Sequence, residues 1–93
     1  MAAEIDKITI EYEQDGQLLV KELDKEILSR GAWCTILFRY TQWDKKNSDF
    51  GPERFSIRRY RKINGEYMQQ SKFTISSESQ AQKIVDTLSG WIG

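Results

Sequence analysis

The chain has 93 residues, 14 basic and 14 acidic side chains and a formal net charge of zero, so it is long enough for one domain with one modest core. It has no histidine and a single cysteine, Cys34, which excludes a His-dependent catalytic triad and an internal disulfide, and argues against structural zinc. No apolar run approaches the roughly 20 residues that span a bilayer, and the first residues lack the pattern of a secretory signal. We therefore expect a cytoplasmic protein with no membrane segment, metal, cofactor or catalytic residue.

Charge is distributed unevenly along the chain. Residues 1–26 hold eight acids and three lysines, a local charge of −5, which leaves +5 on residues 27–93. Between Arg54 and Ser76, four arginines and two lysines accompany a single acid, Glu66. The net charge of zero and the pI near 6.3 argue mildly against a nucleic-acid partner, but these totals hide that the small domain has one pole of each sign.

The N-terminal third predicts a hairpin. Lys7–Gln14 alternates apolar and polar residues as a half-buried strand does, and Asp15-Gly16 is a dipeptide favoured in tight hairpin turns. Residues 17–29 fit two interpretations, a helix from the spacing of their leucines or a strand after the turn, and the turn favours the strand. We describe residues 1–20 as an acidic extension of a single domain, 1–93, whose remainder is 21–93.

Three more strands are predicted downstream. Ala32–Asp44 is rich in β-branched and aromatic residues, and a polar loop follows it to Pro52. The segments Arg54–Lys62 and Tyr67–Ile75 then flank an Asn64-Gly65 turn. A three-residue loop there would set Phe55 opposite Phe73, and we predict that register because it separates apolar from charged side chains.

This register assigns the side chains of the hairpin to two faces. Phe55, Ile57, Phe73 and Ile75 form the expected core face, on which Arg59 and Arg61 also fall. The opposite, solvent-facing side is expected to carry Ser56, Arg58, Tyr60, Lys62, Met68, Gln70, Lys72 and Thr74. Cys34 is most simply a small core residue.

The chain ends in a predicted helix. Ser77 and Gln80 have the spacing of a capping box, and apolar residues recur at helical spacing from Ala81 to Ile92. The predicted fold class is therefore α+β: a curved antiparallel sheet of four to five strands with one C-terminal amphipathic helix packed on one face.

Cations at strand spacing with an interleaved aromatic suit a single-stranded nucleic acid, because cations track phosphates and a base can stack on an aromatic ring. The candidate binding residues are Arg39, Trp43, Lys45, Lys46, Arg58, Tyr60, Lys62, Gln70 and Lys72. The competing interpretation is an ordinary soluble sheet surface, or a basic face neutralised by the acidic N-terminal hairpin. For Tyr60 and Trp43, packing competes with base stacking.

The segments ILSRGAWCTILFRYTQWD, PERFSIRRY and SKFTISSES resemble the transcriptional coactivator family called positive cofactor four, and more closely its short bacterial relatives. The resemblance covers roughly three quarters of the chain, in short motifs. It implies a homodimer whose sheets bind single-stranded DNA with little sequence preference, and it places the family's strand arginine on Arg39 and its tryptophan on Trp43. The family's Lys-Gly before the last apolar pair falls on Ser71-Lys72, so the glycine is missing here.

The sequence is compatible with three functions. The leading hypothesis is a sequence-nonspecific domain for single-stranded DNA or RNA, serving transcription or replication. The alternative is a protein-interaction or dimerisation module without a nucleic-acid ligand. A third, an enzyme using carboxylates of the acidic hairpin, would need a concave pocket that the sequence does not announce.

Overall fold

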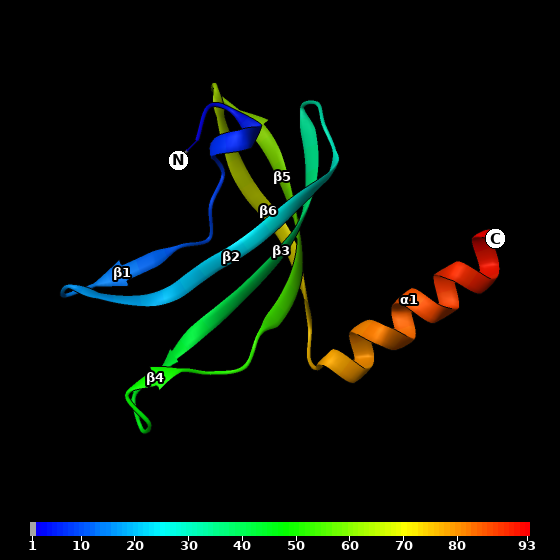
Figure 1. Ribbon diagram of the computed structural model, residues 1–93. Coiled ribbons are helices and arrows are strands. Elements are labelled where there is room, and N and C mark those ends of the chain that lie inside the picture. The colour runs from blue at the N-terminus through cyan, green and yellow to red at the C-terminus, as the bar shows by residue number, and fades with distance from the viewer. Residues whose placement is uncertain (1) are drawn as a thin grey trace.

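The computed structural model describes residues 2–93, which form a curved antiparallel sheet and one C-terminal helix (Figure 1). After a short 3₁₀ turn, η1 (Ile5–Lys7), the elements are β1 (Tyr12–Gln14), β2 (Gln17–Ser29), β3 (Trp33–Asp44), β4 (Asp49–Phe50), β5 (Arg54–Ile63), β6 (Glu66–Ile75) and α1 (Glu78–Ile92). The strand order is β1-β2-β3-β5-β6, and β4 pairs with β3. The predicted α+β class is confirmed, and residues 17–29 are a strand.

Two tight turns shape the sheet. Asp15 and Gly16 have φ angles of 52° and 81°, and Asn64 and Gly65 have 52° and 83°. Both residues of each pair adopt the left-handed conformation that a two-residue hairpin turn with the twist of the flanking strands requires. The hairpin at Asp15-Gly16 is confirmed. The three-residue loop predicted at Asn64-Gly65 is wrong, and so is the pairing of Phe55 with Phe73, since Phe55 lies opposite Ile75.

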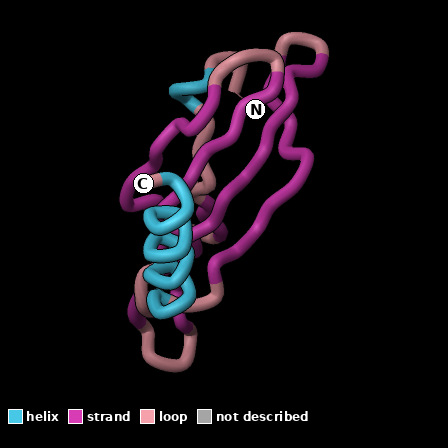
Figure 2. The backbone as a smooth tube through the Cα atoms, turned by 90° about the vertical axis from the view of Figure 1, so that its right-hand side faces the viewer, coloured by secondary structure: helices cyan, strands magenta, loops and turns pink. Residues whose placement is uncertain are grey.

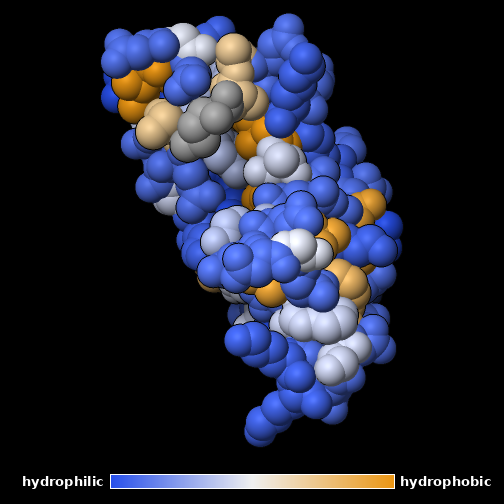
Figure 3. All heavy atoms as spheres, turned by 90° about the vertical axis from the view of Figure 1, so that its left-hand side faces the viewer, coloured by the Kyte–Doolittle hydropathy of each residue, from blue (hydrophilic) through white to orange (hydrophobic). Residues whose placement is uncertain are grey.

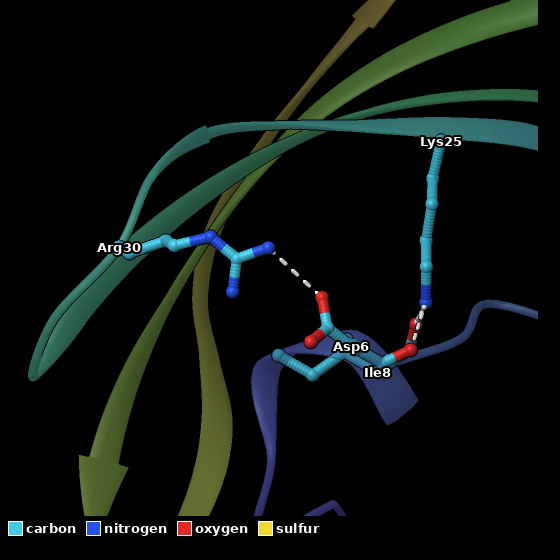
Figure 4. A network of polar contacts seen from close by, with 4 residues as sticks. All are labelled: Asp6, Ile8, Lys25 and Arg30. Carbon is cyan, nitrogen blue, oxygen red and sulfur yellow. Dashed lines mark hydrogen bonds and ion pairs between the residues drawn. The ribbon is translucent and has the colours of Figure 1, made fainter.

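The segment before β1 joins the sheet mainly through side chains, and through one backbone hydrogen bond from the Tyr67 amide of β6 to the Ala2 carbonyl oxygen at 2.8 Å. Lys25 Nζ of β2 donates hydrogen bonds to the carbonyl oxygens of Asp6 at 2.8 Å and Ile8 at 2.6 Å. The Asp6 carboxylate accepts from Arg30 at 3.0 Å (Figure 4). The Glu22 carboxylate accepts from the Thr9 hydroxyl at 2.8 Å. Regular pairing with β2 covers only Tyr12–Gln14, so the strand predicted over Lys7–Gln14 is reduced to these three residues.

The hydrophobic core lies under this N-terminal segment. Ile8 and Ile10 are buried against Cys34, Ile36, Phe38, Tyr40, Tyr60 and Tyr67. We call this side of the sheet the core face. The largest fully buried side chains, Phe38, Ile36, Cys34 and Ser56, all lie on it. The surface over this side is mostly hydrophilic, with apolar side chains in separate patches (Figure 3).

The other side of the sheet, the helix face, carries Leu37, Phe55, Ile57 and Phe73. Helix α1 lies on this side and packs against the sheet through β6 (Figure 2). Of the four residues expected to form the core face, Ile75 is buried, but Phe55 and Ile57 are half-buried and Phe73 is 52% exposed. The expectation that these residues form the main core is therefore wrong. The physical reason is that Ile8 and Ile10 close the opposite face, whereas the helix covers this one only in part.

The helix begins as predicted. Ser77 Oγ accepts a hydrogen bond from the Gln80 amide at 3.1 Å, and Gln80 Oε1 accepts from the Ser76 amide at 2.8 Å. The capping box is therefore confirmed at Ser77, with its return bond one residue earlier than the usual pattern. Much of the helix's apolar surface stays open to solvent, with Val85 55%, Trp91 80% and Ile92 83% exposed.

Candidate nucleic-acid interface

The β5–β6 hairpin carries a bulge that sets which side chains share a face. Ile63 pairs with Glu66 and Tyr60 with Gln69, but Arg59 pairs with Ser71, so Gln70 is an extra residue on β6. Such a bulge shifts the pairing of the outer strand by one position. As a result Arg58 lies directly opposite Lys72, and Ile57 opposite Phe73. The predicted separation of Arg58 and Lys72 from Phe55, Ile57, Phe73 and Ile75 is confirmed, although the turn that was expected to produce it is different.

The bulge also moves one predicted residue to the other side. Met68 pairs with Arg61 and therefore lies on the helix face, whereas Tyr67 and Gln69 lie on the core face with Tyr60. Gln70 has no partner on β5, and its side-chain amide donates to the carbonyl of Met68 at 3.1 Å. The expectation that Met68 shares a face with Arg58 is wrong.

The cations of this hairpin have no acidic partner in the part of the chain that the structure describes. Ion pairs within 4.0 Å among those residues join Lys7 to Glu4, Arg30 to Asp6 and Arg39 to Glu53. None of them involves the six cations of β5 and β6: Arg54, Arg58, Arg59, Arg61, Lys62 and Lys72. The acidic β1–β2 hairpin forms no ion pair with them, and β3 stands between β2 and β5 in the sheet. The hairpin is therefore basic on both sides, with Arg54, Arg58, Lys62 and Lys72 on the core face and Arg59 and Arg61 on the helix face. We call it the basic hairpin.

Arg58 is the most restrained of these cations. Its guanidinium donates to Ser56 Oγ at 3.3 Å and to Gln69 Oε1 at 3.1 Å, and its Cζ lies 6.0 Å from the centroid of the Phe38 ring. Lys62 and Lys72 on the same face are exposed. A half-buried, hydrogen-bonded arginine on the same face as two exposed lysines suits phosphate contact, because less of its side-chain freedom is lost on binding.

Tyr60 lies on the predicted face but belongs to the core. It is 5% exposed and packs with Cys34 under the N-terminal segment. Burial raises the pKa of its phenol above the ordinary value, and the neighbouring Arg58 partly offsets that shift. Burial also raises the pKa of the Cys34 thiol. A base cannot stack on a ring this enclosed, so the packing interpretation of Tyr60 holds.

The remaining predicted residues lie away from Arg58. Arg39 is on the helix face, where its guanidinium pairs with Glu53 at 3.2 Å, so a single surface that holds both Arg39 and Arg58 is not formed. Trp43 is half-buried and meets Phe50 edge to face, with ring centroids 5.2 Å apart. Lys45 and Lys46 are exposed in the β3–β4 turn, at the end of the sheet opposite the Asn64-Gly65 turn (Figure 1).

The structure brings together a cluster that the sequence did not assign to the site. Trp33 is 42% exposed and lies opposite Arg61 on the helix face. The Cζ atoms of Arg59 and Arg61 lie 4.6 Å and 5.4 Å from the centroid of its ring. At exposed sites such cation–π contacts are worth about 0.5–1 kcal/mol. Alternation along β3 and β5 indicates which side chains share a face within each strand. Only the register between β3 and β5 shows that Trp33 lies next to Arg59 and Arg61.

Other kinds of site and known relatives give no competing assignment. Within residues 2–93 no group of three or more acidic, cysteine or histidine side chains is arranged to hold a metal ion. No helix of this part of the chain is long and apolar enough to cross a membrane. No family model, curated protein or solved structure matches the chain.

Proposed function

We propose that the protein binds single-stranded nucleic acid, without sequence preference, through the basic hairpin. The observation that carries this proposal is the absence of an acidic partner for the six cations of β5 and β6 among the described residues. Like charges gathered on one hairpin raise the local potential, and a polyanion relieves their repulsion. The function is one of binding and includes no chemical step.

The binding mode follows from the arrangement of the cations. Arg58, Lys62 and Lys72 lie on one face, where they can follow successive phosphates, and the Gln69 amide beside Arg58 can bond to sugars or bases. A single strand can bend along a curved sheet, whereas a duplex resists bending over a few base pairs. Contacts to phosphates carry no sequence information, so affinity depends on charge and salt.

Fluorescence anisotropy with a labelled oligothymidylate of about 15 nucleotides tests the proposal, since such sites span about 4–16 nucleotides. Replacing Arg58 and Lys72 together by Ala removes two phosphate contacts, so the slope of log affinity against log salt should flatten by about 1.4. The matched control is K21A/K83A, which removes two cations outside the basic hairpin. An unchanged slope in R58A/K72A, or an equal change in the control, would reject the basic hairpin as the binding surface.

The cellular setting is part of the same proposal. The resemblance to the positive cofactor four family supports DNA as the ligand, a transcription or replication role and a bacterial cytoplasm. Discrimination between DNA and RNA depends on contact with the 2′-hydroxyl. Competition between oligodeoxythymidylate and oligouridylate for the labelled strand measures that preference, and the ultraviolet absorbance ratio of the purified protein tells whether it carries nucleic acid.

A second candidate function, self-association, is favoured by the open helix. The described chain exposes 6760 Å² and is only 17 Å thick along its shortest axis. A compact monomer of 10.9 kDa exposes about 5,600 Å², so about 1,200 Å² is in excess. A stable interface covers about 800 Å² on each partner. A homodimer that buries α1 and the part of the helix face next to it, which includes the exposed Phe73, would remove this excess.

The helix itself gives a further reason for a partner. An isolated helix of 15 residues is marginal in water and depends on packing of its apolar side. Sedimentation of the parent protein should give twice the mass of one chain. The V85E/L88E variant should give the mass of one chain, whereas Q82E, on the polar side of the helix, should still give the mass of two. A dimer that captures protein from a nuclease-treated extract but binds no oligonucleotide would favour the interaction module over nucleic-acid binding.

A further inference from the structure

The helix face ends, near the Asn64-Gly65 turn, in the cluster of Trp33, Arg59 and Arg61 that no motif assigned. The two guanidinium groups accompany one indole, and all three side chains are exposed. Ser71 lies opposite Arg59 on β6, and Met68 lies opposite Arg61. A hydroxyl and a polarisable thioether therefore border the cluster on the outer strand.

We infer that Trp33, Arg59 and Arg61 form a nucleotide subsite, in which an unpaired base stacks on the indole and the two arginines bind its flanking phosphates. This inference rests on the proposed nucleic-acid binding and gives it a second surface. Tyr60 and Tyr67 on the core face are buried, so that face can contact phosphates but offers no open ring there. Trp33 is the exposed ring that shares a cluster with cations of the basic hairpin.

The alternative role for the two arginines is to shield an exposed indole from water. An arginine that is also paired with an acid could shield it equally well, because its apolar stem and flat head group would still cover the ring. Here Asp24 and Glu26 lie on the same face, on β2, yet neither forms an ion pair with Arg59 or Arg61. Two guanidinium groups without an acidic partner, next to an exposed indole, suit a ligand that has both a negative charge and a flat ring.

The two arginines can exchange their contact with the indole for a contact with phosphate by side-chain rotation alone. Both arginines are exposed, so each can swing from the indole to a phosphate oxygen, where a bidentate contact is stronger than its contact with the ring. The vacated indole then receives the base. Because β6 is an edge strand, a nucleic acid that passes around it can reach Lys72 on one face and Arg59 on the other.

The first test uses the protein's own fluorescence. The W43F/W91F variant keeps Trp33 as the single tryptophan. Oligothymidylate should quench its emission at saturation, because stacking brings the base against the indole, whereas inorganic polyphosphate should bind with little quenching. Equal quenching by the two polyanions would overturn the subsite.

The second test compares affinities. W33A should lose about ten-fold in affinity for oligothymidylate and keep its affinity for polyphosphate, whereas W33F should keep most of both. W91A, which removes another exposed indole, is the matched control and should change neither. Thermal unfolding of each variant shows that the comparison is made between folded proteins, and the quenching test needs no change at Trp33.

The outcomes separate this inference from the function on which it rests. If W33A binds oligothymidylate as tightly as the parent while R58A/K72A binds weakly, the subsite is rejected and nucleic-acid binding stands. If W33A loses both ligands equally, the indole only positions the arginines and the stacking role is rejected. If the parent binds no oligothymidylate, both proposals fail.

Discussion

The two faces of the sheet use the same strands but are closed to different extents. On the core face, Ile36 and Phe38 are completely buried, because Ile8 and Ile10 cross over them. On the helix face, Ile57 is half-buried and Phe73 is 52% exposed. Apolar content alone therefore does not decide where the core forms. The segment that crosses a face decides it. Here that segment is a short N-terminal stretch held by Lys25 and Glu22 of β2, by Arg30 and by the backbone of β6.

The largest expected effect is the difference in stability loss between two Phe→Ala variants, one on each face of the sheet. Phe38→Ala should lower the free energy of unfolding by about 3–5 kcal/mol, because the packed side chains around it can relax only partly into the cavity. Phe73→Ala, matched in chemistry but half-exposed, should cost about 1 kcal/mol or less. Urea denaturation at low protein concentration measures both, and equal losses would contradict the assignment of the core face.

The next effect tests the attachment of the N-terminal segment. Lys25→Met removes the donor to the Asp6 and Ile8 carbonyl oxygens while keeping an apolar stem of similar length. We expect a loss of about 1–3 kcal/mol in the free energy of unfolding, because two carbonyls lose a charged partner. Lys21→Met is the control, since Lys21 lies over the Phe50 ring and is exposed. If Lys21→Met lowered the free energy of unfolding as much as Lys25→Met, the effect would come from the lost charge and not from the hydrogen bonds to Asp6 and Ile8.

A smaller effect of opposite sign is expected in the helix. Gly90 lies within α1, where an added methyl group would meet no atom within 4 Å. Gly90→Ala should therefore raise helix stability by about 0.5–1 kcal/mol. Gly65→Ala should instead destabilise the protein by about 1–2 kcal/mol, because φ there is 83°. Thermal unfolding followed by far-ultraviolet circular dichroism compares the two, and a destabilised Gly90 variant would indicate that the helix is packed more closely than described.

The smallest effect is a dependence on alkaline pH. Burial raises the pKa of Tyr60, so the folded protein keeps this proton at a pH where the unfolded chain, with an ordinary pKa of about 10, has lost it. Stability from this group is complete below about pH 10 and falls as the pH rises through the folded-state pKa. Tyr60→Phe should reduce the decline in the urea midpoint above about pH 10, whereas Tyr12→Phe, at an exposed position, should not. Identical profiles for the two variants would contradict the burial of Tyr60.

Alternation along β3, β5 and β6 was enough to predict the sheet, and the pairing of Ser77 with Gln80 was enough to place the helix start. The predicted separation of Arg58 and Lys72 from Phe55 and Ile57 was right for the same reason, since side chains of a strand alternate between faces. Which face becomes the core was not predictable in this way. It depends on the path of residues 5–10, which is fixed by contacts from Lys25, Arg30 and Glu22 across the chain.

The candidate site shows the same limit. Arg58, Lys62 and Lys72 were found from local alternation, whereas the burial of Tyr60 and the ion pair of Arg39 with Glu53 arise from distant segments. The Trp33 cluster joins two strands whose relative register a sequence does not state. The charges of the site were thus predictable, but its aromatic component was not.

The bulge at Gln70 gives the outer strand one residue more than a regular ladder needs. If this residue were forced into the ladder, the pairing set by the Asn64-Gly65 turn would continue, and Lys72 would stand opposite Ile57 and Phe73 opposite Ser56. If Gln70 were deleted instead, Ser71 would follow Gln69 directly and Lys72 would still meet Arg58. A one-residue deletion at Gln70 therefore leaves each side chain of the hairpin on its present face. A deletion within β5 or the turn has no extra residue to absorb it, so it would shift the pairing.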